Sequence, residues 1–376
     1  MKIEKYKLKN GETRYKFQTY LGLNPLSNKY VYKQKKGFKT YAEAVKEYSK
    51  IKNKLHNKPE TKRVLFVDVY EEWFYQKSYS IKSSTLYSIQ LRFKNHILPY
   101  FGKMYMDKIQ INELQEYTNL KFKEIKGYKR LIQYISSLFK FAINKGYLDY
   151  NPCQNIIYPE DLNEKYNFED KEENFLNTDE LVIFLKECKE VLDDMWYLYF
   201  YLLTFTGMRK GEGLGLDWKN IKNINGKYII KIRQTVTRGL DGMMIGFPKT
   251  KESIRDIEIT KDLYDLLMNW QEKQRDIFGD LKMVFNNTKC DYVTQSLPAK
   301  KLNKVYENLD IKKITIHGLR HTFASICFEA GMQVKEVQGI LGHSDYQITL
   351  NLYTHLTKKR KEESINKFNN YIQKHL

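Results

Sequence analysis

The chain has 376 residues, 42% of them apolar and 14% aromatic, a composition typical of a globular protein with two or three domains. Its longest apolar stretch, residues 195–205, is far shorter than the ~20 residues of a membrane span, and the N-terminus shows no secretory signal. The four cysteines are widely separated and form no CxxC pair, which favours reduced thiols over a disulfide or zinc framework. We therefore expect a cytoplasmic protein that does not enter a membrane.

The net charge of +19 is concentrated near the N-terminus. Residues 1–63 hold 18 basic and 5 acidic side chains, so they account for +13 of it. A short, aromatic-rich segment with this excess predicts a polyanionic partner. Nucleic acid suits the pattern better than a membrane surface, because the first forty residues contain no basic amphipathic helix.

The basic segment predicts a small α+β domain over residues 1–58. The runs GETRYKFQTYLGL and NKYVYKQKKGF alternate aromatic and cationic residues, which indicates strands of a three-stranded sheet. Thr40 and Glu43 then form a capping box for a helix through about residue 54. One face of the sheet can pack on this helix while the other presents cations, although an ordinary solvated face explains any single lysine. The candidate DNA-binding cations are Arg14, Lys16, Lys33 and Lys35.

After a polar stretch, amphipathic helical patterns continue to Pro152. They predict an all-α domain over residues 64–155. Residues 156–176 then hold seven acidic and two basic side chains and few apolar ones, so they are predicted to be a linker.

The third region, residues 177–376, mixes helices with a short β segment. Asn177 and Glu180 form a second capping box at its start. A buried helix is expected to end at Gly207. Strands are expected over residues 227–259, with a turn at Gly239-Leu240-Asp241-Gly242.

The stretch ITIHGLRHTFAS has the features of an anion site. Thr315 can cap a helix in whose first turn His317 and Arg320 share one face. The N–H groups at a helix N-terminus attract anions, and an imidazole beside a guanidinium adds oriented donors. His317 and His321 also have the spacing of a metal pair. No glutamate lies between them, however, and Arg320 would repel a cation, so we expect no metal.

Two further stretches add polar candidates. Arg209 follows Gly207, where a left-handed residue can end the buried helix and direct the arginine toward a cleft. His343 precedes Tyr353 by ten residues in LGHSDYQITLNLYTH. Alone, Arg209 is typical of a surface residue and Tyr353 is one of 30 tyrosines, but four of the seven histidines gather in these stretches.

The three stretches resemble the sequence boxes of the tyrosine recombinases, the phage and transposon integrase family. They occur in the family's order as TGMRKGE, HGLRHTFA, and LGHS followed by LYTH, and the resemblance covers most of the chain. It implies a multidomain fold. A small α+β arm-binding module at residues 1–58 and an all-α core-binding domain at 64–155 precede the linker. A mixed, mainly α catalytic domain with a small β-hairpin follows at 177–376.

The resemblance also implies which residues act on DNA. Four of them would surround the scissile phosphate and the fifth would be the nucleophile: Arg209, His317, Arg320, His343 and Tyr353. In FPKTKESIR, Lys249 matches the hairpin lysine of the family, and Lys251 is its rival. Ser84 and Thr85 match positions in the core-binding domain and are further DNA-binding candidates.

One supporting position and one departure lie in the first box. Glu212 matches an acidic residue that supports the first arginine in the family, and its spacing from Arg209 permits a pair within one helical turn. Gly213 and Gly215 stand where family members carry alanine or bulkier residues. Because each glycine costs up to ~1 kcal/mol of helix propensity, we expect a looser helix there.

The implied chemistry is attack of Tyr353 on a DNA phosphodiester, which leaves a 3′-phosphotyrosyl link and a free 5′ hydroxyl. Because the covalent intermediate conserves the bond energy, no cofactor is expected. The implied partners are double-stranded DNA with core and arm sites, a homotetramer on synapsed DNA, and an accessory factor for direction. The expected setting is a bacterial mobile element, with the enzyme at the nucleoid. The alternatives are type IB topoisomerase activity alone and an inactive DNA-binding protein.

The C-terminal tail carries a basic run, KKRK at residues 358–361, and then apolar residues at helical spacing. This stripe can fold back on its own domain. The resemblance instead implies that it docks into a neighbouring subunit and orders the tetramer.

Overall fold

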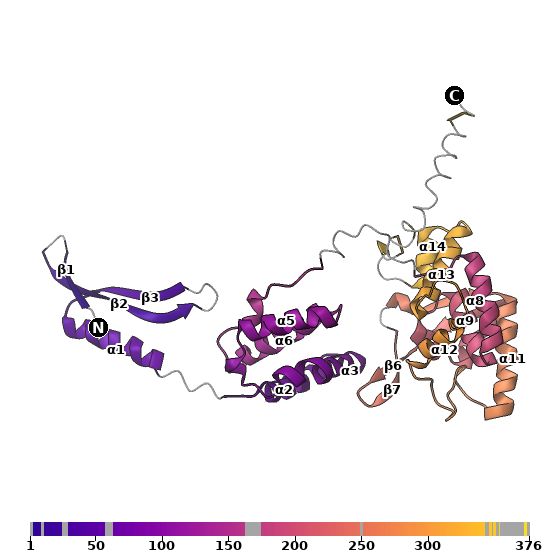
Figure 1. The fold of residues 1–376 in the computed structure, drawn as a ribbon, viewed down its shortest axis with the longest axis horizontal. Coiled ribbons are helices and arrows are strands. Elements are labelled where there is room, and N and C mark those ends of the chain that lie inside the picture. The colour runs from indigo at the N-terminus through magenta and orange to yellow at the C-terminus, as the bar shows by residue number, and fades with distance from the viewer. Residues whose placement is uncertain are drawn as a thin grey trace. The chain divides into compact units, whose positions relative to one another are not determined.

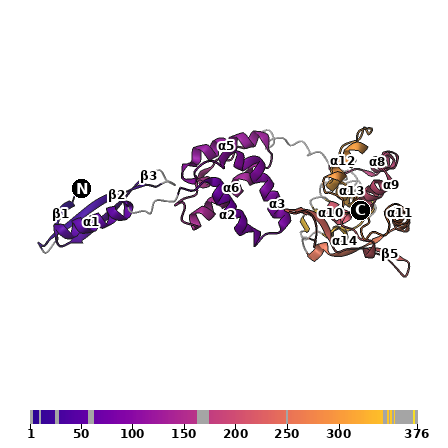
Figure 2. The same ribbon diagram turned by 90° about the horizontal axis from the view of Figure 1, so that it is seen from below.

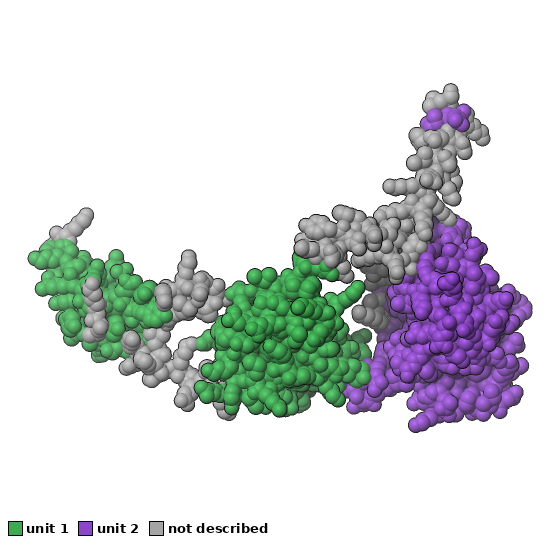
Figure 3. All heavy atoms as spheres, in the orientation of Figure 1, with its two compact units in different colours: residues 1–167 green, residues 168–376 purple. Residues whose placement is uncertain are grey.

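The fold of the chain is taken from a computed structural model (Figure 1). The structure describes residues 3–8, 11–24, 29–56, 63–161, 174–248, 251–342, 346–347, 349–350, 353 and 372–373. Lys249, His343 and nearly all of the C-terminal stripe lie outside these residues. Contacts within the chain divide it into two compact units, Met1–Asn167 and Phe168–Leu376 (Figure 3). In the described part of the chain, no helix combines the length and apolarity that crossing a bilayer requires.

The first unit begins with the N-terminal sheet, which confirms the predicted small α+β fold. Antiparallel strands in the order β1-β2-β3 pack against one helix: β1 (Ile3–Lys7), β2 (Thr13–Asn24), β3 (Lys29–Phe38) and α1 (Tyr41–His56). Phe17 of β2 is buried between Phe38, stacked at 5.6 Å, and Tyr48 of α1, edge-on at 5.3 Å. The backbone N–H of Glu43 donates to Thr40 Oγ1 at 3.1 Å, so the predicted cap of α1 is confirmed.

The rest of the first unit is all helical, as predicted, and is called the helical region (Phe66–Ile156). Its helices are α2 (Phe66–Ser78), α3 (Ser83–Arg92), the π-helical η1 (Phe93–Ile97), α4 (Leu98–Phe101), the 3-10 turn η2 (Met106–Lys108), α5 (Ile111–Glu124), α6 (Tyr128–Asn144) and the 3-10 turn η3 (Pro152–Asn155). Phe93 is fully buried at the centre, stacked on Tyr70 at 4.3 Å and near Trp73 at 5.4 Å. Aromatic packing therefore holds α2 and η1 together.

The second unit is mainly helical with two small sheets. Its helices are α8 (Thr178–Val191), α9 (Asp194–Thr206), α10 (Lys210–Leu214), α11 (Lys261–Phe278), α12 (Leu297–Val305), α13 (Ile316–Glu329) and α14 (Val334–Leu341), with 3-10 turns η4 (Trp218–Asn220) and η5 (Lys251–Ser253). One sheet has the order β4-β5-β8 and the other pairs β6 with β7: β4 (Ile221–Ile224), β5 (Lys227–Ile232), β6 (Thr235–Gly239), β7 (Gly242–Gly246) and β8 (Arg255–Ile259). The predicted turn joins β6 to β7, because Gly239 pairs with Gly242.

Helix α9 is the centre of the second unit. It contacts α8, α10, α11, α13 and β8, and Figures 1 and 2 show it among α8, α11 and α13. Trp196, Tyr199 and Phe200 lie on different sides of this helix and are all buried, which explains its nearly uniform apolar sequence. The helix ends at Gly207 in the left-handed conformation, with φ 61°, as predicted.

The chain enters the second unit along α13, before α8 begins. The Asn174 amide donates to Thr315 Oγ1 at 3.0 Å and accepts from the Thr315 N–H at 2.8 Å. The backbone N–H of Leu176 donates to Thr322 Oγ1 at 2.9 Å. Asn174 is thus fastened to the N-cap of α13, and we call this contact the Asn174 clasp.

The ends of the predicted linker are packed. Ile156 belongs to the core of the helical region, and Leu176 is fully buried in the core of the second unit. Both residues fall in the predicted linker because that prediction considered the acidic composition of the whole segment and not its apolar ends. Residues 162–173, between them, lie outside the described part of the chain.

Candidate active site

Two helix ends meet at the polar centre of the second unit. Helix α9 ends at Gly207 with φ 61°, and α14 ends at Gly342 with φ 65°. A Cβ at Gly207 would lie 2.6 Å from the Leu341 side chain, and a Cβ at Gly342 would lie 2.6 Å from the Glu252 carbonyl oxygen. Both positions therefore need glycine for its left-handed backbone and for its lack of a side chain.

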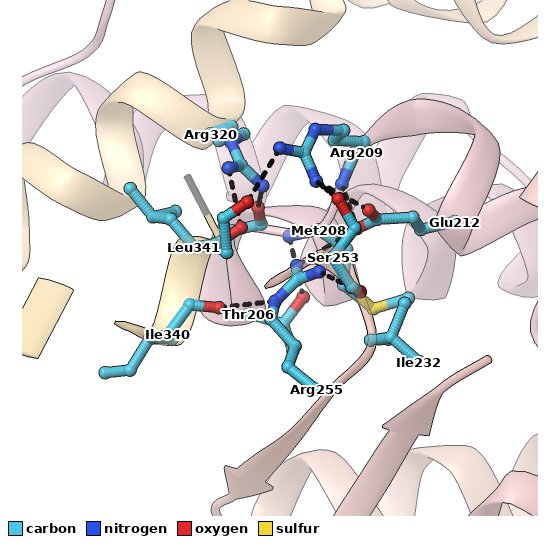
Figure 4. A network of polar contacts seen from close by, with 12 residues as sticks. Thr206, Met208, Arg209, Glu212, Ile232, Ser253, Arg255, Arg320, Ile340 and Leu341 are labelled. Atoms are coloured by element: carbon cyan, nitrogen blue, oxygen red, sulfur yellow. Dashed lines mark hydrogen bonds and ion pairs between the residues drawn. The ribbon is translucent and has the colours of Figure 1, made fainter. Parts of the chain in front are cut away.

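Three arginines bind three successive carbonyls at the C-terminus of α14 (Figure 4). The donor–acceptor pairs are Arg255 Nε with Ile340 O at 2.5 Å, Arg320 Nη2 with Leu341 O at 2.7 Å, and Arg209 Nη2 with Gly342 O at 3.0 Å. We call these acceptors the α14 carbonyls. The last carbonyls of a helix lack partners within it and carry the negative end of its dipole. The end of α14 therefore attracts and orients the three cations.

Glu212 of α10 is the carboxylate inside this group. It is 3% exposed and accepts from Arg209 Nη1 at 2.8 Å and from Arg255 Nη2 at 3.0 Å. It also accepts from the backbone N–H of Arg209 at 3.0 Å, so the expected pair within one turn forms. Burial alone would raise the pKa of the Glu212 carboxyl, but Arg255 and Arg209 outweigh it and lower that pKa. Glu212 therefore remains a carboxylate that fixes two guanidiniums.

Arg320, on α13, is almost completely buried at 2% exposure. Its Nη1 donates to the Gly207 carbonyl at 2.7 Å, while its buried Nε has no hydrogen-bond partner among the described residues. Burial, with Arg209 and Arg255 nearby, lowers the pKa of Arg320 to about 9, so the guanidinium is still charged at neutral pH. A buried N–H without a partner calls for an acceptor that the described residues do not supply.

Two histidines lie beside these arginines on α13. Thr315 caps the helix as predicted, accepting from the Gly318 N–H at 3.2 Å, and this places His317 in the first turn. The rings of His317 and His321 meet edge-to-face at 4.7 Å. Burial, Arg320 and Arg209 lower the pKa of His317, so it is neutral at pH 7 and can accept a proton. Within the described ranges, no three metal-ligating side chains gather into a site.

Tyr353 packs on the same helix. Its side chain is 37% exposed, and its ring meets Phe328 edge-on at 5.2 Å. Phe328 follows Arg320 by eight residues, about 12 Å along the axis of α13. The described residues thus bring together Arg209, Glu212, His317 and Arg320, and Tyr353 packs against α13, the helix that carries His317 and Arg320. Lys249, His343 and the side chain of Lys251 lie outside the described part of the chain.

Sequence reasoning missed Arg255 and Ser253. Arg255 Nη2 reaches Glu212, and Ser253 Oγ accepts from Arg209 Nη1 at 3.3 Å. A signal for Arg255 is present in the alternation of β8, where Arg255, Ile257 and Ile259 are buried and the intervening residues are exposed. An arginine on the inward face of a strand needs a buried partner.

The expectation of a looser helix at the first box is wrong. The described helix α10 is short, and its last four residues are buried. A Cβ at Gly213 would lie 3.0 Å from the Leu203 side chain, and a Cβ at Gly215 would lie 3.0 Å from the Val236 nitrogen. These glycines let α10 approach α9 and β6 closely, so their effect here is tight packing rather than looseness.

The expected common face of the four N-terminal cations is also wrong. In the β2–β3 register Lys33 lies opposite Thr19 and Lys35 opposite Phe17, on the face that packs on α1. Lys35 forms an ion pair with Glu47 of α1 at 2.5 Å. The pairing of residues 16–20 with residues 32–36, which is bounded by a register shift at each end, decides this parity, and sequence alternation cannot reveal it.

The open face of the N-terminal sheet carries a different set of cations. It holds Arg14 and Lys16, with Lys36 opposite Lys16, and beside them Tyr20 and Tyr32 with rings 5.5 Å apart. Arg14 pairs with Glu12 at 2.9 Å and Lys16 with Glu4 at 3.2 Å. In the helical region, Ser84 and Thr85 lie in the first turn of α3, where Thr85 is exposed.

Comparison with known proteins identifies the chain's relatives. The profile of the phage integrase family matches residues 174–360, and that of the phage integrase N-terminal SAM-like domain matches residues 65–122. A protein named tyrosine recombinase XerC-like, from Caldanaerobacter subterraneus subsp. tengcongensis, is 30% identical over 96% of this chain and 97% of its own length.

Solved structures share the fold. The integrase of transposon Tn1549 in complex with circular intermediate DNA superposes with a TM-score of 0.61 and 22% identity, covering 81% of this chain and all of that one. A lambda integrase tetramer bound to a Holliday junction gives a TM-score of 0.55 and 17% identity, covering 91% of this chain and 95% of that one. With these folds, the profile matches and the full-length relative, the chain belongs to the phage integrase family of tyrosine recombinases, site-specific enzymes that cut and rejoin DNA strands.

Proposed function

We propose that the cluster around the α14 carbonyls binds the scissile phosphate of DNA and that Tyr353 attacks it. One observation carries this proposal: the buried Nε of Arg320 has no partner among the described residues and lies beside the 36% exposed guanidinium of Arg209. Glu212 pairs with Arg209 and Arg255, whereas both described acceptors of Arg320 are uncharged carbonyls. The site thus carries excess positive charge, which a phosphodiester would neutralise.

The reaction balances as a transesterification. Tyr353 Oη bonds to phosphorus, the bond from phosphorus to the 5′ oxygen breaks, and the product is a 3′-phosphotyrosyl link with a free 5′ hydroxyl. Neutral His317 takes up the phenolic proton, and Lys249 gives a proton to the 5′ oxygen. Arg209, Arg320 and His343 donate to the non-bridging oxygens, where charge gathers. Attack by a 5′ hydroxyl of a partner strand reverses the step and completes the exchange.

The remaining regions supply DNA binding and assembly. The N-terminal sheet would bind arm sites and the helical region, through Ser84 and Thr85 among others, core sites. Four copies would act on two synapsed duplexes, with an accessory factor setting direction and the C-terminal stripe docking between copies. This arrangement is supported by the relatives solved with DNA, including the lambda tetramer on a Holliday junction. The setting would be the bacterial cytoplasm, at the nucleoid.

Trapping of the covalent intermediate tests the catalytic assignment. A duplex selected for binding from a random library is nicked just downstream of the cleavage position, so that the short fragment carrying the free 5′ hydroxyl diffuses away and the adduct accumulates. Wild-type protein should form the adduct in EDTA as well, because no metal is assigned. Tyr353→Phe should bind the duplex and form none, while Tyr346→Phe, which changes an exposed tyrosine of the same segment, should behave as wild type. An adduct with Tyr353→Phe, or activity that disappears in EDTA and returns with zinc, contradicts the assignment.

The open face of the N-terminal sheet gives a separate test of arm binding. Replacing Arg14, Lys16 and Lys36 by glutamine removes three cations, so the slope of log K against log salt should fall by roughly 0.9 for each DNA phosphate that the variant no longer neutralises. Lys33→Gln, on the opposite face, is the matched control and should leave the slope unchanged. Equal slopes for the triple variant and wild type would exclude this face from DNA binding.

A further inference from the structure

Arg255 is the most fully bonded cation of the site. It opens β8, its side chain is 6% exposed, and each of its three nitrogens donates to an acceptor. The acceptors are Ile340 O at 2.5 Å, Ser253 O at 3.2 Å and Glu212 Oε2 at 3.0 Å. Arg209 is 36% exposed and Arg320 retains an unused donor, so those two remain available to a phosphate. Arg255 is buried with each nitrogen engaged, which suits an internal connection rather than substrate binding.

The three acceptors of Arg255 belong to three parts of the site. Glu212 is on α10 and fixes Arg209, Ile340 is at the end of α14, and Ser253 is in the turn that follows Lys249 in the chain. Along α14, the next two carbonyls hold Arg320 and Arg209. The Arg255 side chain also packs closely against Gly342 at the end of α14, because a Cβ at Gly342 would lie only 3.0 Å from Arg255 Cδ. The side chain of Arg255 therefore supports both groups that orient the phosphate-binding arginines.

We propose that Arg255 is a positioning residue that holds Glu212 and the α14 carbonyls in register, so that Arg209 and Arg320 meet the phosphate in a fixed geometry. This inference rests on the function proposed for those two arginines. Removal of the guanidinium would leave Glu212 with one cation and Ile340 O without its donor. Misplacement of catalytic groups by about 1 Å can cost on the order of 100-fold in rate. We expect slower chemistry with little change in DNA affinity.

The test compares single-turnover cleavage of the nicked duplex by three full-length variants. Arg255→Met keeps the length and apolar stem of the side chain but removes its donors, and it should cleave about ten- to hundred-fold more slowly with an unchanged Kd for DNA. Arg255→Lys keeps the positive charge but lacks the planar guanidinium that binds several acceptors at once. Compared with Arg255→Met, it should therefore recover more of the thermal stability than of the cleavage rate. Arg275→Met removes an exposed arginine that pairs with Asp280 at 2.8 Å, and it should change neither.

A pH profile separates positioning from a purely structural role. The charged groups acting on Glu212 are Arg255, Arg209 and Arg320. Without Arg255 the pKa of Glu212 should rise, so cleavage by Arg255→Met should decline on acidification at a higher pH than that of wild type. The double variant Arg255→Met/Glu212→Gln should lack this acid limb, because the titrating group is gone.

The outcomes distinguish this inference from the proposed function. If Tyr353→Phe forms no adduct but a folded Arg255→Met cleaves at the wild-type rate with the wild-type pH profile, Arg255 has no positioning role. If Arg255→Met does not fold, Arg255→Lys decides: slow cleavage by folded protein supports the inference, and a wild-type rate overturns it. Failure of both variants to fold also overturns it, because Arg255 would then be needed for the fold alone. An adduct with Tyr353→Phe would refute the proposed function before Arg255 is tested.

Discussion

The helical region and the second unit bury different kinds of side chain at their centres. In the helical region, Phe93 is surrounded by Tyr70 and Trp73, and aromatic contacts fill the core. In the second unit, an apolar core around α9 adjoins a group of three arginines and one glutamate at the α14 carbonyls, all of them buried except Arg209. An apolar core gains free energy from burial itself, whereas buried charges must first replace the hydration they lose. Substitutions in the first should therefore act on stability, and substitutions in the second on stability and chemistry together.

The largest effect is expected from Phe93→Ala. Removing a fully buried aromatic ring costs about 3–5 kcal/mol of unfolding free energy, which should lower the unfolding midpoint of the helical region. Thermal unfolding followed by circular dichroism measures the shift, and Tyr75→Ala, at a 65% exposed ring, should cause little. A large drop in the midpoint of the second unit as well would show that the two units do not unfold separately.

Arg320→Ala tests the charged centre. If Arg320 donates to the scissile phosphate as proposed, its removal should slow cleavage about 10²- to 10³-fold, or roughly 2.7–4 kcal/mol. It should also destabilise the second unit, because the Gly207 and Leu341 carbonyls would be left without their donor. Single-turnover cleavage and thermal unfolding check both parts. If the variant were as stable as wild type and cleaved at the same rate, Arg320 would contribute to neither stability nor chemistry. The expected difference between the two units would then be wrong.

Gly342→Ala tests whether the backbone position of the α14 carbonyls affects cleavage. The new Cβ would combine a positive φ of 65° with a 2.6 Å approach to Glu252 O, so it should cost roughly 1–3 kcal/mol and displace the α14 carbonyls. Gly226→Ala is the matched control, since φ there is 81° but nothing lies within 4 Å. Both variants should lose stability, and cleavage should slow only for Gly342→Ala. Equal cleavage by the two would mean that the end of α14 tolerates movement.

The smallest effect concerns pH. Burial, His317 and Arg320 lower the pKa of His321 to about 4, below its value of about 6.5 in an unfolded chain. Between these values the unfolded chain binds a proton that the folded chain excludes, so this stability is complete above pH 6.5 and is lost on acidification toward pH 4. The unfolding midpoint should therefore fall between pH 7 and pH 5, and His321→Gln should reduce that fall. A fall of the same size in both proteins would assign the acid sensitivity to other groups.

Local rules predicted much of this architecture. The caps at Thr40, Asn177 and Thr315, the left-handed end of α9 and the turn between β6 and β7 are confirmed, because each depends on residues close together in the chain. The faces of Lys33 and Lys35 were wrong because they depend on strand register. The roles of the catalytic residues remain predictions.

The backbone part of the site could not be predicted from side-chain patterns. Arginines at the site bind carbonyls of Gly207, Ile340, Leu341 and Gly342, and a carbonyl has no sequence signature of its own. Only the two glycines hint at it, through their left-handed backbone. The alternation of β8 could have indicated an inward-facing Arg255, but its partner Glu212 is 43 residues away, and only the tertiary fold brings them together.

The Asn174 clasp has a mechanical consequence. Asn174 and Leu176 lie just before helix α8, so their contacts join α13 to the segment that leads into α8. Asn174 accepts a hydrogen bond from the N-cap residue of α13. It also packs closely on the first turn of that helix, because a Cβ at Gly318 would lie 2.7 Å from the Asn174 side chain. Tension on residues 174–176 would therefore act on the turn of α13 that carries His317. A force on this segment would thus reach His317 of the proposed phosphate-binding site through the two hydrogen bonds to Thr315.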